Sequence, residues 1–155
     1  MKGMLKPIIV LTVICLITSA GLALTNAKTV DAIAAVNKQN IKAAEKTVLG
    51  NKQGRAEQGT AKSFGGDLTV MVGIDNAGKI TGVTVTASSD TPGLGSKAAQ
   101  PSYLKQYKGL SAADLNNLKE NKIKDNAKLD AITGATISSN GVYHAVQDAM
   151  SKGGK

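Results

Sequence analysis

Residues 65–88 read GGDLTVMVGIDNAGKITGVTVTAS and carry the clearest strand pattern in this chain of 155 residues. Apolar side chains at positions 68, 70, 72 and 74 alternate with Thr69, Met71 and Gly73. This period of two is typical of a strand with one buried face. DNAG then supplies turn-forming residues, and KITGVTVTAS is a second run rich in β-branched side chains. We therefore predict a β-hairpin over residues 67–88.

Shorter elements are expected on the C-terminal side of the hairpin. DTPGLGSK, residues 90–97, is predicted to be a loop whose glycines allow a ligand to approach the backbone. Residues 101–107 and 112–120 indicate short helices, and 122–129 a short strand or loop. From Ser139 onward, apolar residues at positions 142, 145, 146 and 149 share one helical face, and this helix should end near residues 151–153. The fold class is therefore α+β, with a small, twisted, mainly antiparallel sheet and short helices.

A helix and a loop are expected on the N-terminal side. Residues 28–49 predict an amphipathic helix with a thin apolar stripe formed by Val30, Ile33, Asn37, Ile41, Ala44 and Val48. Gly50 and the polar run NKQGRAEQGTAKS, residues 51–63, predict a loop. We expect four regions: 1–27 as tip and membrane anchor, 28–62 as helix and polar linker, 63–151 as the folded domain, and 152–155 as a tail.

The uncharged run PIIVLTVICLITSAGLALT occupies residues 7–25. As a helix these nineteen residues would be about 28 Å long, close to the hydrocarbon thickness of a bilayer. A cleaved signal peptide has the same opening, and Ala20 or Ala27 would suit its cleavage site. We favour an uncleaved single-pass anchor, because the run is long for a signal core and a helical pattern continues after it.

The charges around the span do not by themselves fix its orientation. Lys2 and Lys6 precede the span, but lysines also follow it, and folded domains translocate largely regardless of charge. We expect a cytoplasmic N-terminus and a domain outside the cytoplasmic membrane.

Composition excludes several kinds of site. The net charge is +8, but no basic run is interleaved with aromatic residues, which argues against nucleic-acid binding. The single cysteine, Cys15, excludes an intramolecular disulfide and a cysteine-based metal or iron–sulfur site within the chain. No metal site is predicted.

DAITGATISSNG, residues 130–141, gathers hydroxyl side chains at the expected helix entrance. With Ser138 or Ser139 as the N-cap, residues 133–136 would lie immediately before the helix. Free amides and the helix dipole favour an anion at this place, and Gly134 and Ala135 leave the backbone open. The residues alone leave two interpretations: hydroxyls that only cap the helix, or a phosphate site.

DAITGAT resembles the flavinylation motif of the FMN-binding domain family, which is an aspartate, two variable positions, Ser or Thr, and Gly-Ala-Thr. In that family a flavin transferase joins FMN through its phosphate to the last threonine. The resemblance therefore implies FMN bound covalently to Thr136. It also implies that the transferase recognises Asp130, Thr133, Gly134, Ala135 and Thr136.

The resemblance extends to LTVMVGIDNAGKITGVTV, TPGLGSK and the opening LKPIIVLTVICLITSAGLALTNAKT. These are similar to the G subunit of Rnf-type ferredoxin:NAD oxidoreductase complexes and, more distantly, to the C subunit of sodium-pumping NADH:quinone oxidoreductase. The similarity implies that the loop over residues 91–95 lies against the isoalloxazine ring. The expected cofactor-binding residues are Thr136, Thr133, Gly134, Ala135, Ser138, Asp90, Thr91, Pro92, Gly93, Leu94 and Gly95.

The implied function is that of an electron-carrier subunit without catalysis of its own. It would relay electrons through FMN in a complex that couples ferredoxin:NAD electron transfer to Na⁺ or H⁺ translocation. The implied partners are the other subunits, the flavin transferase and the membrane. Two departures from the family are visible: many relatives carry Glu at the position of Asp90, and the chain is shorter than most G subunits.

Other functions remain open from the residues. A hydrolase with Thr136 or Ser138 as nucleophile needs a base, but His144, the only histidine, would lie about 12 Å from Thr136 along a helix. GLGSKA lacks the spacing of a phosphate loop. A covalent flavoprotein of another respiratory or extracellular electron-transfer chain and a tethered binding module without cofactor are the remaining alternatives.

Overall fold

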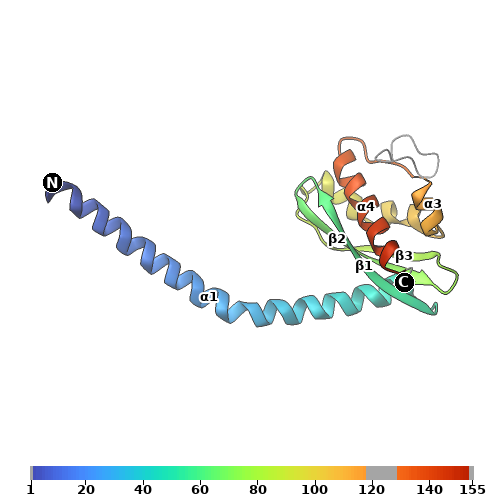
Figure 1. Cartoon of the computed structure of the whole chain (residues 1–155), viewed down its shortest axis with the longest axis horizontal. Helices are drawn as coiled ribbons and strands as arrows, with labels where there is room; N and C mark the ends of the chain where they lie inside the picture. Colours follow the sequence, from blue (N-terminus) through green and yellow to red (C-terminus); the bar gives the residue numbers. More distant parts are fainter. Residues whose placement is uncertain (1, 118–128, 154–155) are drawn as a thin grey trace. The chain divides into compact units, whose positions relative to one another are not determined.

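The computed structural model describes residues 2–117 and 129–153, and the chain divides into two compact units, Met1–Gln39 and Asn40–Lys155. The elements occur in the order helix, three strands, a series of short helices and a final helix (Figure 1).

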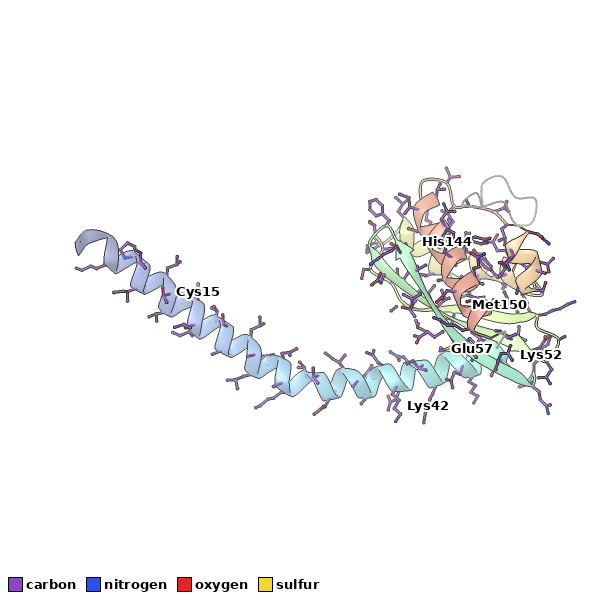
Figure 2. All side chains as sticks on the ribbon, viewed as in Figure 1. Cys15, Lys42, Lys52, Glu57, His144 and Met150 are labelled. Carbon is purple, nitrogen blue, oxygen red and sulfur yellow. The ribbon has the colours of Figure 1, made fainter. Side chains whose placement is uncertain are left out.

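The N-terminal helix α1 spans Lys2–Leu49. It contains both the apolar run at residues 7–25 and the helix expected over residues 28–49. Its most apolar stretch has a mean hydropathy of 2.5, is long enough to cross a membrane, and has no part buried within the protein. Cys15 is exposed on this helix (Figure 2). These properties support a membrane-anchored protein.

Three antiparallel strands form the sheet: β1 (Gly54–Ser63), β2 (Gly66–Asp75) and β3 (Ile80–Ala87), in the order β1-β2-β3. The hairpin predicted over residues 67–88 is confirmed as β2 and β3. The loop predicted over residues 51–63 is confirmed only for residues 51–53 and is wrong from Gly54 onward, because β1 pairs with the whole of β2. Its sequence hides the strand because only Gly59 is fully buried there, so the side chains show no apolar alternation.

Helices cover both faces of the sheet in the Asn40–Lys155 unit. Helix α4 (Thr136–Lys152) lies across one face and packs on the even-numbered residues 68–74 of β2 (Figure 1). On the other face Ala44 and Val48, in the last turns of α1, pack on Met71. The Thr81 hydroxyl donates to the Val48 carbonyl at 2.6 Å. The expectation of one buried face on β2 is therefore wrong at Met71 and Gly73, which are also buried.

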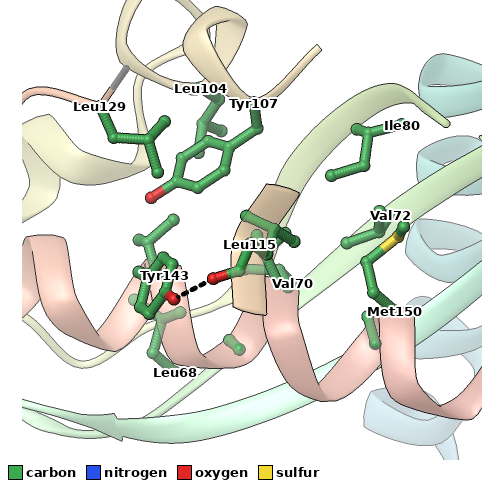
Figure 3. Close-up of a cluster of buried hydrophobic side chains, with 14 of the residues drawn as sticks. Leu68, Val70, Val72, Ile80, Leu104, Tyr107, Leu115, Leu129, Tyr143 and Met150 are labelled. Atoms are coloured by element: carbon green, nitrogen blue, oxygen red, sulfur yellow. Dashed lines mark hydrogen bonds between the residues drawn. The ribbon is translucent and has the colours of Figure 1, made fainter. Parts of the chain in front are cut away.

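The short helices close the core beside α4. They are η1 (Gly95–Ala99), α2 (Pro101–Leu104), η2 (Lys105–Tyr107) and α3 (Ala112–Asn116). Ser111 and Asp114 form a capping box that starts α3. Tyr143 of α4 donates to the Leu115 carbonyl at 2.6 Å, beside the fully buried Tyr107 (Figure 3).

The predicted helices over residues 101–107 and at the start of 112–120 are confirmed. The rest of the second helix and the strand or loop expected over 122–129 lie outside the described residues, except for Leu129, which is buried in the core.

Candidate functional site

A cavity of about 330 Å³ lies where three separate segments of the Asn40–Lys155 unit meet. The segments are the turn between β1 and β2, the loop before η1, and the start of α4. The residues that line the cavity are Phe64, Thr91, Leu94, Gly95, Gly134, Ala135, Thr136, Ile137 and Ser138. The two sequence motifs, TPGLG and TGAT, are therefore brought together from 39 positions apart along the chain (position 95 to position 134).

The start of α4 is shaped by a glycine and a serine. Gly134 has a φ of +81°, a conformation that side-chain-bearing residues rarely adopt. The Ser139 hydroxyl accepts from the Ile132 amide and donates to the Ala135 carbonyl, both at 3.0 Å. These bonds fold the chain back before the helix, whose N-cap is Ala135. The predicted N-cap at Ser138 or Ser139 is wrong, because both serines are buried inside the first turn and a half.

Thr136 is consequently the first residue of α4 rather than a residue before it. Its side chain is exposed, and its hydroxyl makes no hydrogen bond to any residue that the structure describes. Within the same described part of the chain, the amides of residues 136–138 have no acceptor, as is usual at a helix start. The hydroxyl and these amides can receive an anion from the cavity.

The loop over residues 91–95 forms the opposite wall. The Thr91 carbonyl accepts from the amides of Leu94 at 3.3 Å and Ser96 at 3.2 Å, which closes a tight turn. Gly93 has a φ of +79°, and its amide donates to the Ser96 hydroxyl at 2.9 Å. Leu94 therefore projects toward Gly134, on which a Cβ would lie 3.5 Å from the Leu94 Cδ1.

Asp90 is buried behind this wall rather than lining the cavity. It accepts from the Ser63 hydroxyl at 2.5 Å and from the Gly65 amide at 2.7 Å. Burial raises the pKa of Asp90, but hydrogen bonds from Ser63, Gly65 and Ser138 outweigh this effect and hold the pKa below its ordinary value. Gly95 fits tightly here, since a Cβ on it would be 2.8 Å from the Ser138 Oγ and 2.9 Å from the Asp90 Cβ.

The rim of the cavity is apolar and open to solvent. Phe64, Leu94 and Ile137 are 68%, 45% and 57% exposed. Among the described residues outside α1, they are the only large hydrophobic side chains that are exposed to this degree. Such a patch marks a binding surface more often than a scattered exposed residue does.

The structure separates the predicted site residues into two groups. Those that line the cavity are Thr91, Leu94, Gly95, Gly134, Ala135, Thr136 and Ser138. Asp90, Pro92, Gly93 and Thr133 belong to the same segments but do not line it. Asp130 is exposed, and its backbone is held by the Gln106 side chain, which accepts from the Asp130 amide at 2.7 Å.

Sequence reasoning missed Phe64 and Ile137. The available signal was weak: Phe64 is the only phenylalanine and stands in a polar, glycine-rich turn, and Ile137 follows the motif directly.

His144 lies half-buried in the middle of α4, where its ring contacts that of Tyr143 with centroids 5.2 Å apart (Figure 2). It stands two turns beyond Thr136 on the same helix, about 12 Å along the axis. This separation gives a threonine nucleophile no adjacent base. Over the described residues, no group of three or more His, Cys, Asp or Glu side chains is arranged to hold a metal ion.

Comparison with known proteins adds a family and relatives. Residues 63–151 match the family described as the FMN-binding domain. The G subunit of the proton-translocating ferredoxin:NAD(+) oxidoreductase complex of Clostridium ljungdahlii is 34% identical over 91 residues, 58% of this chain and 48% of that protein. The G subunit of the Na(+)-translocating ferredoxin:NAD(+) oxidoreductase complex of Acetobacterium woodii is 36% identical over 89 residues, 57% of this chain and 42% of that protein.

The chain thus spans less than half the length of these two curated relatives. Among solved structures, NqrC of Shewanella oneidensis matches with a TM-score of 0.49 and 23% identity, over 61% of this chain and 47% of that one.

Proposed function

The chain belongs to the FMN-binding domain family, and on this premise we propose that it is a membrane-anchored electron-transfer flavoprotein with FMN bound covalently to Thr136. The observation that carries the proposal is the position of the Thr136 hydroxyl. It is exposed, has no partner among the described residues, and opens into the cavity at the start of α4.

The residues at the start of α4 suit the phosphate end of FMN. In the proposed linkage a bond forms between the Thr136 Oγ1 and the phosphorus atom of FMN, while the Oγ1–H bond and one P–O bond of the flavin nucleotide break. The proton and the oxygen-bound leaving group depart, so the protein gains the mass of one FMN less water. The free amides of residues 136–138 would then donate to the remaining phosphate oxygens, where the helix dipole also favours negative charge. Gly134, with a φ of +81°, lets the chain turn directly before this hydroxyl.

The opposite part of the cavity suits the ring. Leu94 and Ile137 offer apolar contacts, and Thr91 and Gly95 offer the polar backbone and hydroxyl groups that could orient the ring edge. FMN, when bound, supplies the redox chemistry, including the transfer of single electrons, and the protein sets its environment and access. The cavity contains no acid–base pair among the residues that line it, so we propose a relay without a catalytic step of its own.

We extend the proposal to the complex. The relatives of this chain include two G subunits of ferredoxin:NAD(+) oxidoreductase complexes, one proton-translocating and one Na(+)-translocating. We propose that this chain relays electrons within such an Rnf-type complex, beside other subunits, and is matured by a flavin transferase that recognises residues 130–136. The span at residues 7–25 carries no charged side chain that could bind an ion, so we assign translocation to the other subunits. Its N-terminus would lie in the cytoplasm and its domain outside.

Intact mass and in-gel fluorescence test the covalent site. The full chain is co-expressed with a flavin transferase, alongside Thr136→Ala and the control Thr60→Ala, an exposed threonine of β1 outside the cavity. The parent chain and Thr60→Ala should gain one FMN less water and stay fluorescent after denaturation, whereas Thr136→Ala should do neither.

If the parent gains no mass while the transferase modifies a control protein, the flavin proposal fails. A tethered binding module without cofactor would then become the better description. A mass gain that persists in Thr136→Ala would instead move the linkage to another residue.

A further inference from the structure

Phe64 has an unusual position for the only phenylalanine of the chain. It follows β1 in the short turn to β2, and 68% of its surface is exposed although it lines the cavity. Leu94 and Ile137 lie on the same rim. A single exposed aromatic residue needs no explanation, but three large apolar side chains around one cavity form a surface that is suited to a flat ligand.

The backbone on both sides of Phe64 is tied to one carboxylate. Ser63, immediately before it, donates its hydroxyl to the Asp90 Oδ2 at 2.5 Å. Gly65, immediately after it, donates its amide to the Asp90 Oδ1 at 2.7 Å. Hydrogen bonds to a charged acceptor are stronger than those between neutral groups. The turn is thus fixed at the two positions that determine where the Phe64 side chain points.

Asp90 also joins this turn to the rest of the cavity wall. Ser138, in the first turn of α4, lies close to the same residue, since a Cβ placed on Gly95 would be 2.8 Å from the Ser138 Oγ and 2.9 Å from the Asp90 Cβ. Asp90 itself directly precedes the loop over residues 91–95. It therefore joins the β1–β2 turn to this loop and lies close to the start of α4, while only 9% of its own surface is exposed.

We propose that Phe64 forms one wall of the flavin-ring site and that Asp90 is the positioning residue that holds it there. The proposal rests on the proposed flavin function and changes the role expected of Asp90. Its oxygens are already engaged by Ser63 and Gly65, so it acts through the turn rather than by contact with the ring. Phe64 shields one side of the ring from water and from soluble quenchers.

A tryptophan substitution tests the wall. An indole in contact with an isoalloxazine ring quenches its fluorescence, so Phe64→Trp in the flavinylated full chain should lower the native-state emission several-fold. The matched control is Ala77→Trp, at the turn between β2 and β3. Phe64 and Ala77 lie at opposite ends of β2, and a strand of ten residues separates them by about 30 Å. Both variants should recover equal emission after denaturation, which shows equal flavin loading.

Quenching by iodide gives a second measurement. Phe64→Ala should increase the access of iodide to the flavin in the native state, without loss of covalent FMN by mass. If Phe64→Trp and Ala77→Trp give equal emission and iodide access is unchanged in Phe64→Ala, Phe64 does not form a wall of the flavin-ring site. If the chain carries no flavin at all, the proposed function is wrong instead. Mass measurement distinguishes this outcome from a bound flavin that Phe64 does not contact.

The role of Asp90 is tested in the Phe64→Trp background. Adding Asp90→Asn should restore part of the lost emission, because the turn is released while the side-chain volume is kept. Ser63→Ala, which removes one hydrogen bond at a half-buried position, should act in the same direction and serves if Asp90→Asn does not fold. If neither change alters the quenching, Asp90 does not position Phe64.

Discussion

Asp90 is a carboxylate with 9% of its surface exposed, and each of its oxygens accepts a hydrogen bond from a neighbouring segment. A group whose pKa is lowered in the folded protein adds stability above its unfolded pKa and loses it as the pH falls. The ordinary value for this group is 3.8, and its folded pKa is lower. The stabilising effect of Asp90 is therefore complete at neutral pH and is lost in acid.

This gives a prediction for pH-dependent stability. As the pH falls below about 4, the free energy of unfolding should fall less steeply in Asp90→Asn than in the parent domain, because one titrating group is removed. Denaturant unfolding at several pH values measures the slope. Ser63→Ala should give an intermediate slope, and a parent-like slope in Asp90→Asn would contradict the role of Asp90.

Gly59 shows how one residue sets the distance between two elements. A Cβ at this position would lie 1.9 Å from the Ala145 carbonyl oxygen and 2.6 Å from the Ala149 amide nitrogen, both backbone atoms of α4. Neither atom can move without displacing the helix. Glycine is required here for close packing of β1 against α4.

We expect Gly59→Ala to lower the free energy of unfolding by about 3 kcal/mol, as overpacking in a rigid core does. Thermal or denaturant unfolding of the domain measures the loss. Its control is Thr60→Ala, the next and exposed residue, which should change stability by no more than about 0.5 kcal/mol. Similar losses for both variants would show that β1 tolerates displacement from α4.

At the scale of elements, β1 is an edge strand, and α4 supplies partners to two of its backbone groups. The Thr60 amide donates to the Asp148 Oδ2 at 3.0 Å, and the Lys152 Nζ donates to the Gln58 carbonyl at 3.2 Å. Asp148 and Lys152 also pair with each other at 2.6 Å. Unpaired edges invite association with other strands, so this pair protects the edge.

The local prediction concerns hydrogen exchange. Asp148→Ala should speed the exchange of the Thr60 amide, because its acceptor is removed, with little change in global stability for a surface pair. The control Lys62→Ala breaks the exposed ion pair between Lys62 of β1 and Asp67 of β2, and it should leave the exchange rate of the Thr60 amide unchanged. The pKa of Asp148 is lowered by its bonds to Lys152 and to the Thr60 amide, so the protection should persist into mild acid. If Asp148→Ala leaves the exchange rate of the Thr60 amide unchanged, Asp148 does not protect this amide.

The sequence predicts those elements whose side chains follow a single period. The hairpin of β2 and β3 is predicted because its apolar residues alternate, and residues 28–49 of α1 and the helix α4 because their apolar residues recur every three to four positions. β1 was hidden because its buried position is a glycine, and the second buried face of β2 because Met71 is covered by a distant helix end. In the cavity, the residues of both motifs were predicted, but Phe64 reaches it only through the β1–β2 turn.

At the scale of the whole molecule, the division between Gln39 and Asn40 falls inside α1 rather than at its end. Ala44 and Val48 belong to the folded domain, where they cover Met71, and the Val48 carbonyl accepts from the Thr81 hydroxyl. The end of α1 thus contributes to the domain core through Ala44 and Val48, although it continues the helix that contains the apolar stretch.

Two truncations distinguish the roles of the helix. A chain that starts at Asn40 keeps the buried turns and should fold like the full domain. A chain that starts at Gly50 exposes Met71 and loses Val48, which should cost roughly 4 kcal/mol for two large apolar side chains. That is a large part of the stability of a small domain. Denaturant midpoints and near-ultraviolet circular dichroism compare the two chains, and equal midpoints would show that the end of α1 is only a tether.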